Sequence, residues 1–433
     1  MSVPDQSAGR APHALMFIFI TVLLDTMALG MVLPVLPNLI TQLLVGHPIS
    51  PGLAERLHRL PGGTASLAAV IYGLFNTVFA LMQFFFSPMI GSLSDRFGRR
   101  PLILASNIGL GLNYALMFWA PNLAWLFIGR LVSGVTGASI GTASAYIADT
   151  TPPERRSQAF GRIYAAFGAG LMLGPAVGGV LGEYSTRLPF LVAAGLSLSN
   201  ALYGLLVLPE SLPTTQRQGF RWRHANPVGA LGLLRRHPEL FGLASVAFLS
   251  NLAQVSLGSL VVLYATHRYG WTSSTVGVTM AAVGVAVGFV QVVLVGRMAR
   301  RFGNRVTLVT GLVFGAIGMV MAGLASGPLA FLAAVPVMAL WGMSGAAVQT
   351  LMTHHVAKAE QGQLQGANAS LTGISELLGP SIFTLTFAYF VSPGHPMDQA
   401  GTPFLLAGLI LLGAAVWGWI CTRGETDEEP EGD

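Results

Sequence analysis

Apolar residues run along the chain in long blocks, and polar residues gather in the short segments between them. Residues 306–357, for example, contain no Asp, Glu, Lys or Arg. A helix needs about 20 mostly apolar residues to cross the hydrocarbon core of a bilayer. The pattern predicts an all-α membrane protein with twelve spanning helices, near residues 14–39, 66–90, 101–120, 123–147, 162–183, 188–208, 240–266, 273–296, 306–325, 328–351, 363–390 and 402–421.

Composition supports a membrane protein. Of the 433 residues, 53% are hydrophobic and 9% are charged, whereas a soluble domain carries about 25% charged residues. A chain this apolar cannot cover a water-facing surface, so most of its surface faces lipid. The N-terminal apolar stretch is too long for a cleaved signal and contains Asp25, so we interpret it as the first helix. The single cysteine, Cys421, excludes an internal disulfide framework and supplies no metal cluster.

Charge placement predicts the orientation. An even number of spans puts both termini on one side of the membrane. If that side is cytoplasmic, the inner loops hold 18 Lys and Arg residues and the outer loops hold 4. The positive-inside rule then predicts a multi-pass protein of a bacterial inner membrane with both termini in the cytoplasm. The net charge of +5 reflects these inner loops, and nucleic-acid binding is a poor explanation of it.

An internal repeat divides the chain. The sequence GSLSDRFGRR at 91–100 returns as GRMARRFGNR at 296–305, and Gly174-Pro175 returns as Gly379-Pro380, both at an offset of 205. We predict a six-helix half at 1–208, a cytoplasmic loop at 209–238, a second six-helix half at 239–422 and an acidic tail at 423–433. Halves repeated without inversion predict a substrate site between them, near the middle of the membrane.

Three motifs resemble those of the major facilitator superfamily. The segment at 91–100 resembles the superfamily's loop signature, and Arg130 with Gly134 resembles its helix 4 motif. The fifth predicted helix matches the spacing of its antiporter motif. The segments LLDTMALGMVLPVLP, YIADTTPPERR, GQLQG and SLTGISELLGP resemble the tetracycline-resistance efflux branch. The residues that carry the loop signature are Gly91, Asp95, Arg96, Gly98, Arg99 and Arg100, and those of the antiporter motif are Gly161, Gly170, Gly174, Pro175, Gly178 and Gly179.

The resemblance implies roles for these motifs. Asp95 is expected to approach the N-terminus of the helix at 363–390, where the helix dipole favours a carboxylate. The loop arginines either bridge neighbouring helix ends or only set the topology. Glycines at every fourth position of the fifth helix form a smooth ridge for close helix packing, and Pro175 can bend that helix. In exporters that exchange substrate for protons, such a ridge is a hinge and seal between the halves; ordinary helix packing is the alternative.

Three Asp, Glu, Lys or Arg residues lie in the interior of predicted spans: Asp25, Arg130 and Glu376. A charge there costs roughly 2.5–3.5 kcal/mol on insertion scales, so these side chains face a cavity or a partner. A buried carboxyl group can also exchange protons near physiological pH. We therefore expect these three residues to couple transport to protons. A structural ion pair between Asp25 and Arg130 is the alternative, and both interpretations can hold together.

The chain also departs from the tetracycline branch. Asp25 stands at that branch's helix 1 carboxylate position, but Asn113 and Gly315 replace its helix 3 and helix 9 acids. Val287 replaces its helix 8 histidine, and Glu376 stands where the branch has no acid. Either the coupling network has been rebuilt or the substrate has changed, so tetracycline and its metal chelate stay open.

The sequence predicts a transporter and not an enzyme. It shows no nucleophile–base set, metal site or phosphate loop, so no cofactor is expected and the proton gradient is the energy source. We predict a monomeric, proton-coupled exporter of an amphipathic drug-like molecule; an importer or facilitator of a small metabolite is the alternative. Polar residues at the depth of a central cavity, and thus candidate substrate ligands, are Asn76, Gln83, Asn113, Asn251, Gln254, Gln291 and Gln349.

Overall fold

The structure is a computed structural model that describes residues 11–46, 63–137, 139–151, 153–217, 233–234, 237, 239–356, 361–392 and 399–423. The predicted all-α fold is confirmed for these residues. The first part of the chain forms α1 (Ala11–Val32), α2 (Leu36–Gly46), α4 (Gly63–Phe97), α5 (Arg99–Trp119), α6 (Leu123–Thr136), α7 (Ser139–Thr150), α8 (Pro153–Tyr184) and α9 (Leu188–Val207).

A short 3-10 turn, η1 (Thr214–Gln216), follows α9. The second part of the chain begins with α11 (Leu240–Tyr269). A π-helical turn, η3 (Val290–Leu294), then joins two long helices. These helices and their successors are α12 (Ser273–Phe289), α13 (Val295–Gly323), α14 (Pro328–Ala339), α15 (Gly342–His354), α16 (Gln361–Phe390) and α17 (Thr402–Cys421).

Several predicted spans are broken helices. The first span is the pair α1 and α2, bent by 42°. The spans predicted at 123–147 and 328–351 are the pairs α6–α7 and α14–α15. Ten described helices are long and apolar enough to cross a membrane, and the bent pair makes eleven. One of the ten, Ser273–Gly323, contains two predicted spans, which accounts for the twelve.

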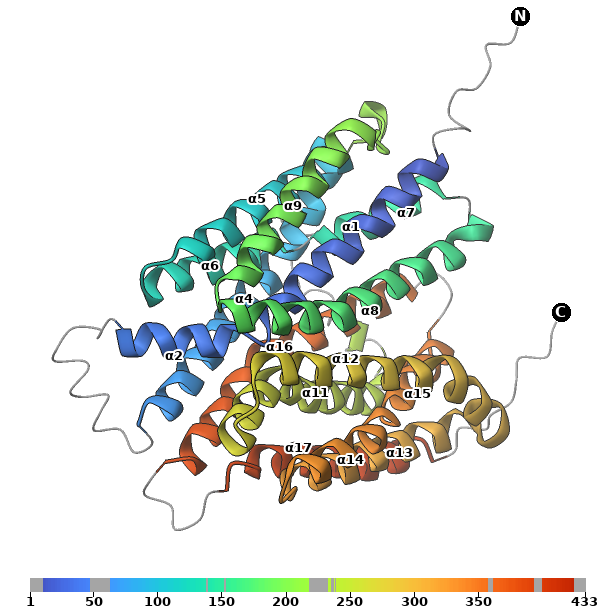
Figure 1. Ribbon diagram of the computed structural model, residues 1–433. Helices are drawn as coiled ribbons and strands as arrows, with labels where there is room; N and C mark the ends of the chain where they lie inside the picture. Colours follow the sequence, from blue (N-terminus) through green and yellow to red (C-terminus); the bar gives the residue numbers. More distant parts are fainter. Residues whose placement is uncertain are drawn as a thin grey trace, which may run out of the picture. The chain divides into compact units, whose positions relative to one another are not determined.

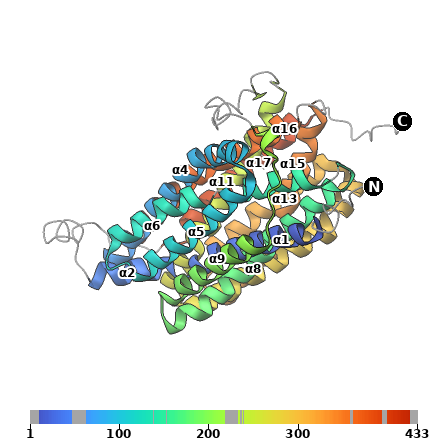
Figure 2. The same ribbon diagram turned by 90° about the horizontal axis from the view of Figure 1, so that it is seen from above.

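The chain packs as two compact units, each of which includes a short segment from the other part of the sequence. Unit 1 is Met1–Leu43, Val78–Asn226 and Thr272–Ala281, and unit 2 is Leu44–Thr77, Pro227–Trp271 and Ala282–Asp433. In unit 1, α8 and α9 pack along α1, and α5 packs on α9 and α6 (Figure 1). In unit 2, α13 packs on α17, α15 and α14, and α11 packs on α16 and α17 (Figure 2). The division of the chain at 209–238 stays a prediction.

Each unit therefore contains a helix segment from the other part of the sequence. In unit 2, the first half of α4 lies along α16: Ser66 Oγ donates to the Ala388 carbonyl at 3.0 Å, and the hydroxyls of Thr77 and Ser381 lie 2.8 Å apart. In unit 1, Thr272 Oγ1, next to the start of α12, donates to Glu183 of α8 at 2.7 Å. The two sequence repeats are thus tied together through α4 and α12.

The internal repeat is visible in the backbone. Gly98, between α4 and α5, has φ 105° and ψ 158°, and Gly303, within α13, has φ 78° and ψ 167°. These residues are 205 positions apart. Residues other than glycine rarely adopt such a positive φ. The second copy thus repeats the sharp turn of the first, and it breaks α13 into two spans at this point.

Two arginines, each two residues after one of these glycines, make the same kind of contact with the end of a helix. Arg100 Nη2 donates to the Leu205 carbonyl at 2.8 Å, and Arg305 Nη2 donates to the Trp419 carbonyl at 3.2 Å. Each acceptor lies two residues before the end of its helix, α9 or α17. A cation is favoured at the C-terminal end of a helix because the last carbonyls carry partial negative charge. Both copies use this contact to fix the last helix of a six-helix half.

The Gly98 turn gives a test of the fold. A Cβ at position 98 would meet the Glu210 carboxylate, and alanine would be forced to a positive φ. We expect Gly98→Ala to lower the free energy of unfolding by about 1–3 kcal/mol, seen as a lower Tm in detergent. In Gly296→Ala, within helix α13, the added Cβ meets nothing within 4 Å, so this control should match the wild type or exceed its stability by up to about 1 kcal/mol. Equal Tm values for the two variants would contradict the assignment.

Candidate functional site

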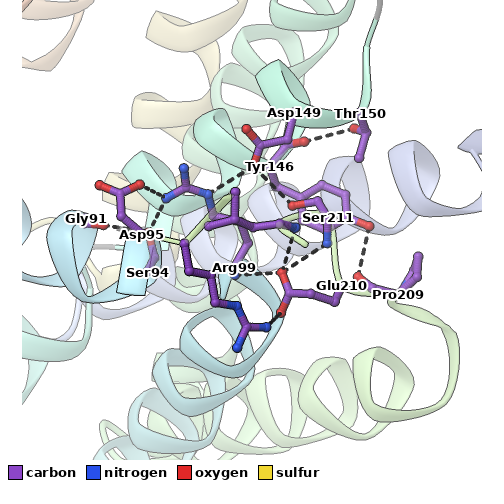
Figure 3. A network of polar contacts seen from close by, with 12 residues as sticks. Gly91, Ser94, Asp95, Arg99, Tyr146, Asp149, Thr150, Pro209, Glu210 and Ser211 are labelled. Atoms are coloured by element: carbon purple, nitrogen blue, oxygen red, sulfur yellow. Dashed lines mark hydrogen bonds and ion pairs between the residues drawn. The ribbon is translucent and has the colours of Figure 1, made fainter. Parts of the chain in front are cut away.

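A polar network lies at the turn between α4 and α5 (Figure 3). Its first centre is Glu210, whose Oε1 accepts hydrogen bonds from the backbone N–H groups of Arg99, at 2.8 Å, and of Ser211 and Leu212, both at 3.0 Å. Arg99 is the first residue of α5, so the carboxylate caps a helix N-terminus, where the dipole favours negative charge. Gly98 leaves the space that the Glu210 carboxylate occupies.

The second centre of the network is the side chain of Arg99, a buried residue that is 8% exposed. Its Nη1 lies 2.6 Å from Asp95 Oδ1, and its Nε lies 3.0 Å from Asp149 Oδ2. Its Nη1 also donates to Ser94 Oγ at 2.6 Å. One guanidinium thus joins α4, α5 and α7. Because guanidinium presents several donors in a fixed plane, it can hold two carboxylates at once.

The other members of the loop signature are spread around this centre. The Gly91 carbonyl accepts a hydrogen bond from Ser94 Oγ at 2.7 Å. Arg96 is exposed, and its guanidinium lies 5.2 Å from the centre of the Phe97 ring. Arg99 and Arg100 contact neighbouring helix ends, whereas Arg96 contacts its chain neighbour. The approach of Asp95 to the N-terminus of α16 stays a prediction.

Sequence reasoning missed Asp149 and Glu210. Both lie just beyond a predicted span, and their partner Arg99 is 50 and 111 residues away. The available signal was an isolated acid at each helix end, Asp149 in YIAD and Glu210 in LPES. In the second copy Arg300 and Asn304 stand where the first has Asp95 and Arg99. The acid–arginine bridge therefore belongs to the first copy alone.

A second polar centre is buried inside unit 1 around Asp25. Asp25 lies in α1 and is 8% exposed. With its amide nitrogen toward Asp25, Asn107 of α5 places Nδ2 at 3.3 and 3.2 Å from the two carboxylate oxygens. Asn200 Nδ2, from α9, then donates to Asn107 Oδ1 at 3.0 Å, and Thr21 Oγ1 donates to Asn200 Oδ1 at 3.2 Å. Asn107 thus bonds the carboxyl group directly, and residues of α9 and α1 extend the chain of hydrogen bonds behind it.

Arg130 of α6 lies in the same buried region and is 5% exposed. Its guanidinium carbon lies 4.6 Å from the centre of the Phe79 ring of α4, so the ring face contacts the cation. The charges of Asp25 and Arg130 both act on the Tyr114 hydroxyl of α5. Two of the three predicted coupling residues are therefore near one another. A direct Asp25–Arg130 ion pair stays a prediction.

Glu376, the third predicted coupling residue, lies on α16 in unit 2 and is exposed. The same helix exposes Leu378 and Leu385, at 45% and 53%. With about 100° between successive residues, Glu376 is about 180° from Leu385 around the helix axis and about 160° from Leu378. Glu376 therefore lies on the opposite side of α16 from these two exposed leucines. Ser375 and Gly379 pack against α11, at the Phe248 carbonyl and at Val255.

The candidate substrate ligands divide into two groups. Three amides join helices: Asn113 donates to Ser133 Oγ at 2.6 Å, Asn251 to Thr372 Oγ1 at 3.0 Å, and Gln349 accepts from Asn368 at 2.6 Å. The other four lie at a helix surface, where Asn76 and Gln83 of α4 are half-buried, and Gln254 of α11 and Gln291 of the π-helical turn are exposed. Gln254 and Gln291 are therefore the most accessible of the seven.

The glycine ridge of α8 packs mainly on α1. A Cβ at Gly170, Gly174 or Gly178 would overlap Thr26, Met27 or Met31 of α1, and the Cβ at position 174 would also lie 2.8 Å from Gly30 Cα. Other members of the motif contact α12: Gly179 meets the Ser273 backbone, and the Pro175 carbonyl meets Gly277. Gly161 has open space around it. The motif thus gives α8 one close contact with α1 and another with the first turns of α12.

Within the described residues, no three His, Cys, Asp or Glu side chains come together in a way that could hold a metal ion. The charged groups that do come together are arginine–carboxylate pairs and the amide-bonded Asp25. Such groups carry or exchange protons and fix helix ends, and they contain no activated nucleophile. This chemistry fits binding and movement of a solute.

Known proteins are similar to the chain over most of its length. The Major Facilitator Superfamily model matches residues 18–380. The tetracycline resistance protein of class C from Escherichia coli is 35% identical over 413 residues, which cover 94% of this chain and 98% of that protein. The class G protein from Vibrio anguillarum is 35% identical over 368 residues, covering 84% and 88%.

Solved structures share the fold. A bacterial homolog of the human lysosomal transporter Spinster has a TM-score of 0.74 at 16% identity, covering 98% of both chains. The human organic anion transporter MFSD10 has a TM-score of 0.67 at 22% identity, covering 94% of this chain and 99% of that one. Transporters of this family are not enzymes and need no cofactor. The chain belongs to the major facilitator superfamily, as a membrane transport protein.

Proposed function

We propose that this transporter exports an amphipathic, drug-like small molecule in exchange for protons. The observation that carries the proposal is the buried Asp25 carboxyl group, which receives amide hydrogen bonds inside a bundle of apolar helices. A purely structural position would hold an apolar residue at lower cost, because a charge at this depth is unfavourable. A proton that binds Asp25 removes that charge, so protonation and release can drive a change between two states.

The relatives support the export direction and the substrate class. They are named as tetracycline resistance proteins, and a membrane transporter that confers resistance does so by moving the drug outward. The antiporter motif of α8 is present as well. We propose an orientation with both termini in the cytoplasm because of the 18-to-4 distribution of basic residues, and a protein that works as a monomer.

Tetracycline itself is less well supported than the broader class. Asn113, in place of the branch's helix 3 acid, is 2% exposed and bonded to Ser133. Gly315, in place of its helix 9 acid, has no room for a larger side chain, since a Cβ there would lie 2.8 Å from Trp341 Cγ. Val287 packs with the apolar cluster around Val290. We infer that the ligand is not a metal chelate, and that Glu376 binds a cationic group or carries a second proton.

Asp25→Asn tests the coupling directly. The variant keeps a hydrogen-bonding side chain of the same size but cannot exchange a proton. We expect it to insert normally and to lose pH-gradient-driven transport in vesicles, down to the rate of vesicles without protein. Glu239→Gln, at an exposed acid that pairs with His237, is the control and should transport like the wild type. A full pH response in Asp25→Asn would assign Asp25 to structure, and gradient-driven accumulation in the opposite sense would support the importer alternative.

Glu376→Gln separates the two roles proposed for that residue. If the carboxylate binds the ligand, the variant loses cationic substrates and keeps neutral ones of similar size. If it carries a proton, the variant loses all gradient-driven transport but still exchanges substrate between two pools. Both are read from a substrate panel in vesicles at several pH values. Wild-type behaviour with every substrate at every pH would remove Glu376 from the mechanism.

Arg99→Gln tests the inner network. It removes the one cation between Asp95 and Asp149 and leaves these acids to repel each other. Since Asp95 and Asp149 are partly exposed, we expect a loss of about 1–3 kcal/mol in the free energy of unfolding rather than the larger value for a fully buried pair. Arg96→Gln removes a cation from the same loop and should cost less than about 0.5 kcal/mol. Thermal unfolding in detergent measures both losses. Equal losses would show that Arg99 contributes only its positive charge to the loop and that its ion pairs with Asp95 and Asp149 do not add stability.

A further inference from the structure

Three consecutive hydrogen bonds link the polar groups around Asp25 into a chain. Thr21 and Asp25 lie one turn apart on α1. From Thr21 the chain passes to Asn200 of α9, from there to Asn107 of α5, and back to Asp25. Each link is between 3.0 and 3.3 Å. The connection therefore leaves α1, crosses two neighbouring helices and returns to the same helix one turn later.

All links of the chain point in one direction. Thr21 donates its hydroxyl proton to Asn200, Asn200 donates to Asn107, and Asn107 donates to the carboxylate. The residues at the three donor positions are nearly inaccessible, at 1% for Thr21, 2% for Asn200 and 0% for Asn107. Hydrogen bonds aligned in this way polarise one another, so the chain stabilises an ionised Asp25 more than one isolated amide would.

The same chain can run in the opposite direction. An amide has an acceptor at one end and donors at the other, so turning Asn107 presents its oxygen to Asp25. That orientation suits a protonated Asp25, which has a proton to donate. Asn200 can then turn to accept from Asn107 and to donate to the Thr21 hydroxyl. Two amide rotations and one hydroxyl rotation are enough, and no helix has to move.

We propose that Asn107, Asn200 and Thr21 are positioning residues that reverse their hydrogen bonds when Asp25 gains or loses its proton. Asn107 meets the carboxyl group itself, and the other two act through Asn107. The proton stays on the Asp25 carboxyl group until it is released, and the chain passes no net proton because its side chains end each cycle with the protons they began with. This inference rests on the proposed function of Asp25 as the proton site.

Other charged and titratable groups surround Asp25 on the packed helices. Arg130 and Tyr114 are the near ones, from α6 and α5. The rest lie toward helix ends. On α8, for example, Gly170 meets Thr26 beside Asp25, and Arg162 and Glu183 are eight and thirteen residues from that glycine. The more distant groups with described side chains on α5, α7, α8 and α9 are Arg99, Arg100, Tyr146, Asp149, Arg162, Glu183, Tyr184 and Tyr203.

The test is the pH profile of transport in vesicles. Asn107→Leu removes the donor to the ionised carboxylate, so protonated Asp25 should persist to higher pH. We expect the midpoint of the profile to move up by about one pH unit, as the loss of one hydrogen bond to a charged group implies. Thr21→Val keeps the side-chain shape and removes only the far end of the chain, so its midpoint should move in the same direction by less.

Thr26→Val is the matched control. Thr26 is a buried threonine on the same helix, next to Asp25, but its hydroxyl donates to the Val22 and Leu23 carbonyls within α1. Its midpoint should stay at the wild-type pH. If Thr21→Val and Thr26→Val behave alike, or if Asn107→Leu lowers the rate without moving the midpoint, the chain is structural and the inference is wrong. If Asp25→Asn keeps a pH response, the proposed function fails first, which distinguishes the two failures.

Discussion

Charged and amide groups inside the bilayer must find their partners within the protein, since no water is available there. The arrangement around Asp25 follows from this constraint. A carboxylate in α1 is possible because α5 and α9 each contribute an asparagine at the same depth, and because Arg130 lies nearby. Removing any one of them leaves a buried polar group without its partner, which costs more than the bond contributes when present.

The polar network at the turn between α4 and α5 is subject to a different constraint. There the helix ends meet water, and the acids can stay charged at little cost. What the loop requires is a defined geometry, and Gly98 provides it by placing the first N–H of α5 against the Glu210 carboxylate. Arg99 then holds α4 and α7 through two acids. In our proposal the polar chain inside the membrane responds to a proton, whereas the loop network holds neighbouring helices together.

Much of this structure could be predicted from the sequence because apolar length and charge position are local properties. The spans and the repeat are of this kind. The breaks after Val32 and Ala339 were not predicted, because an apolar block does not reveal where a helix bends. Asn107 and Asn200 were missed for another reason: an asparagine in an apolar helix is an ordinary residue until its neighbour on another helix is known. Asp149 and Glu210 are partners of Arg99 across distances in sequence that no spacing rule covers.

The paired turns at Gly98 and Gly303 bear on how the two copies of the repeat diverged. Both copies keep the glycine turn and the arginine that reaches the end of the last helix, so these features serve a need that each half has by itself, namely to fold. The carboxyl groups of the spans are not shared in this way. The helix α11, which opens the second copy as α1 opens the first, contains no Asp or Glu, and Leu171 stands 205 positions before Glu376. Comparison of the two copies therefore distinguishes the features that both retain for folding from the carboxyl groups that only one copy has.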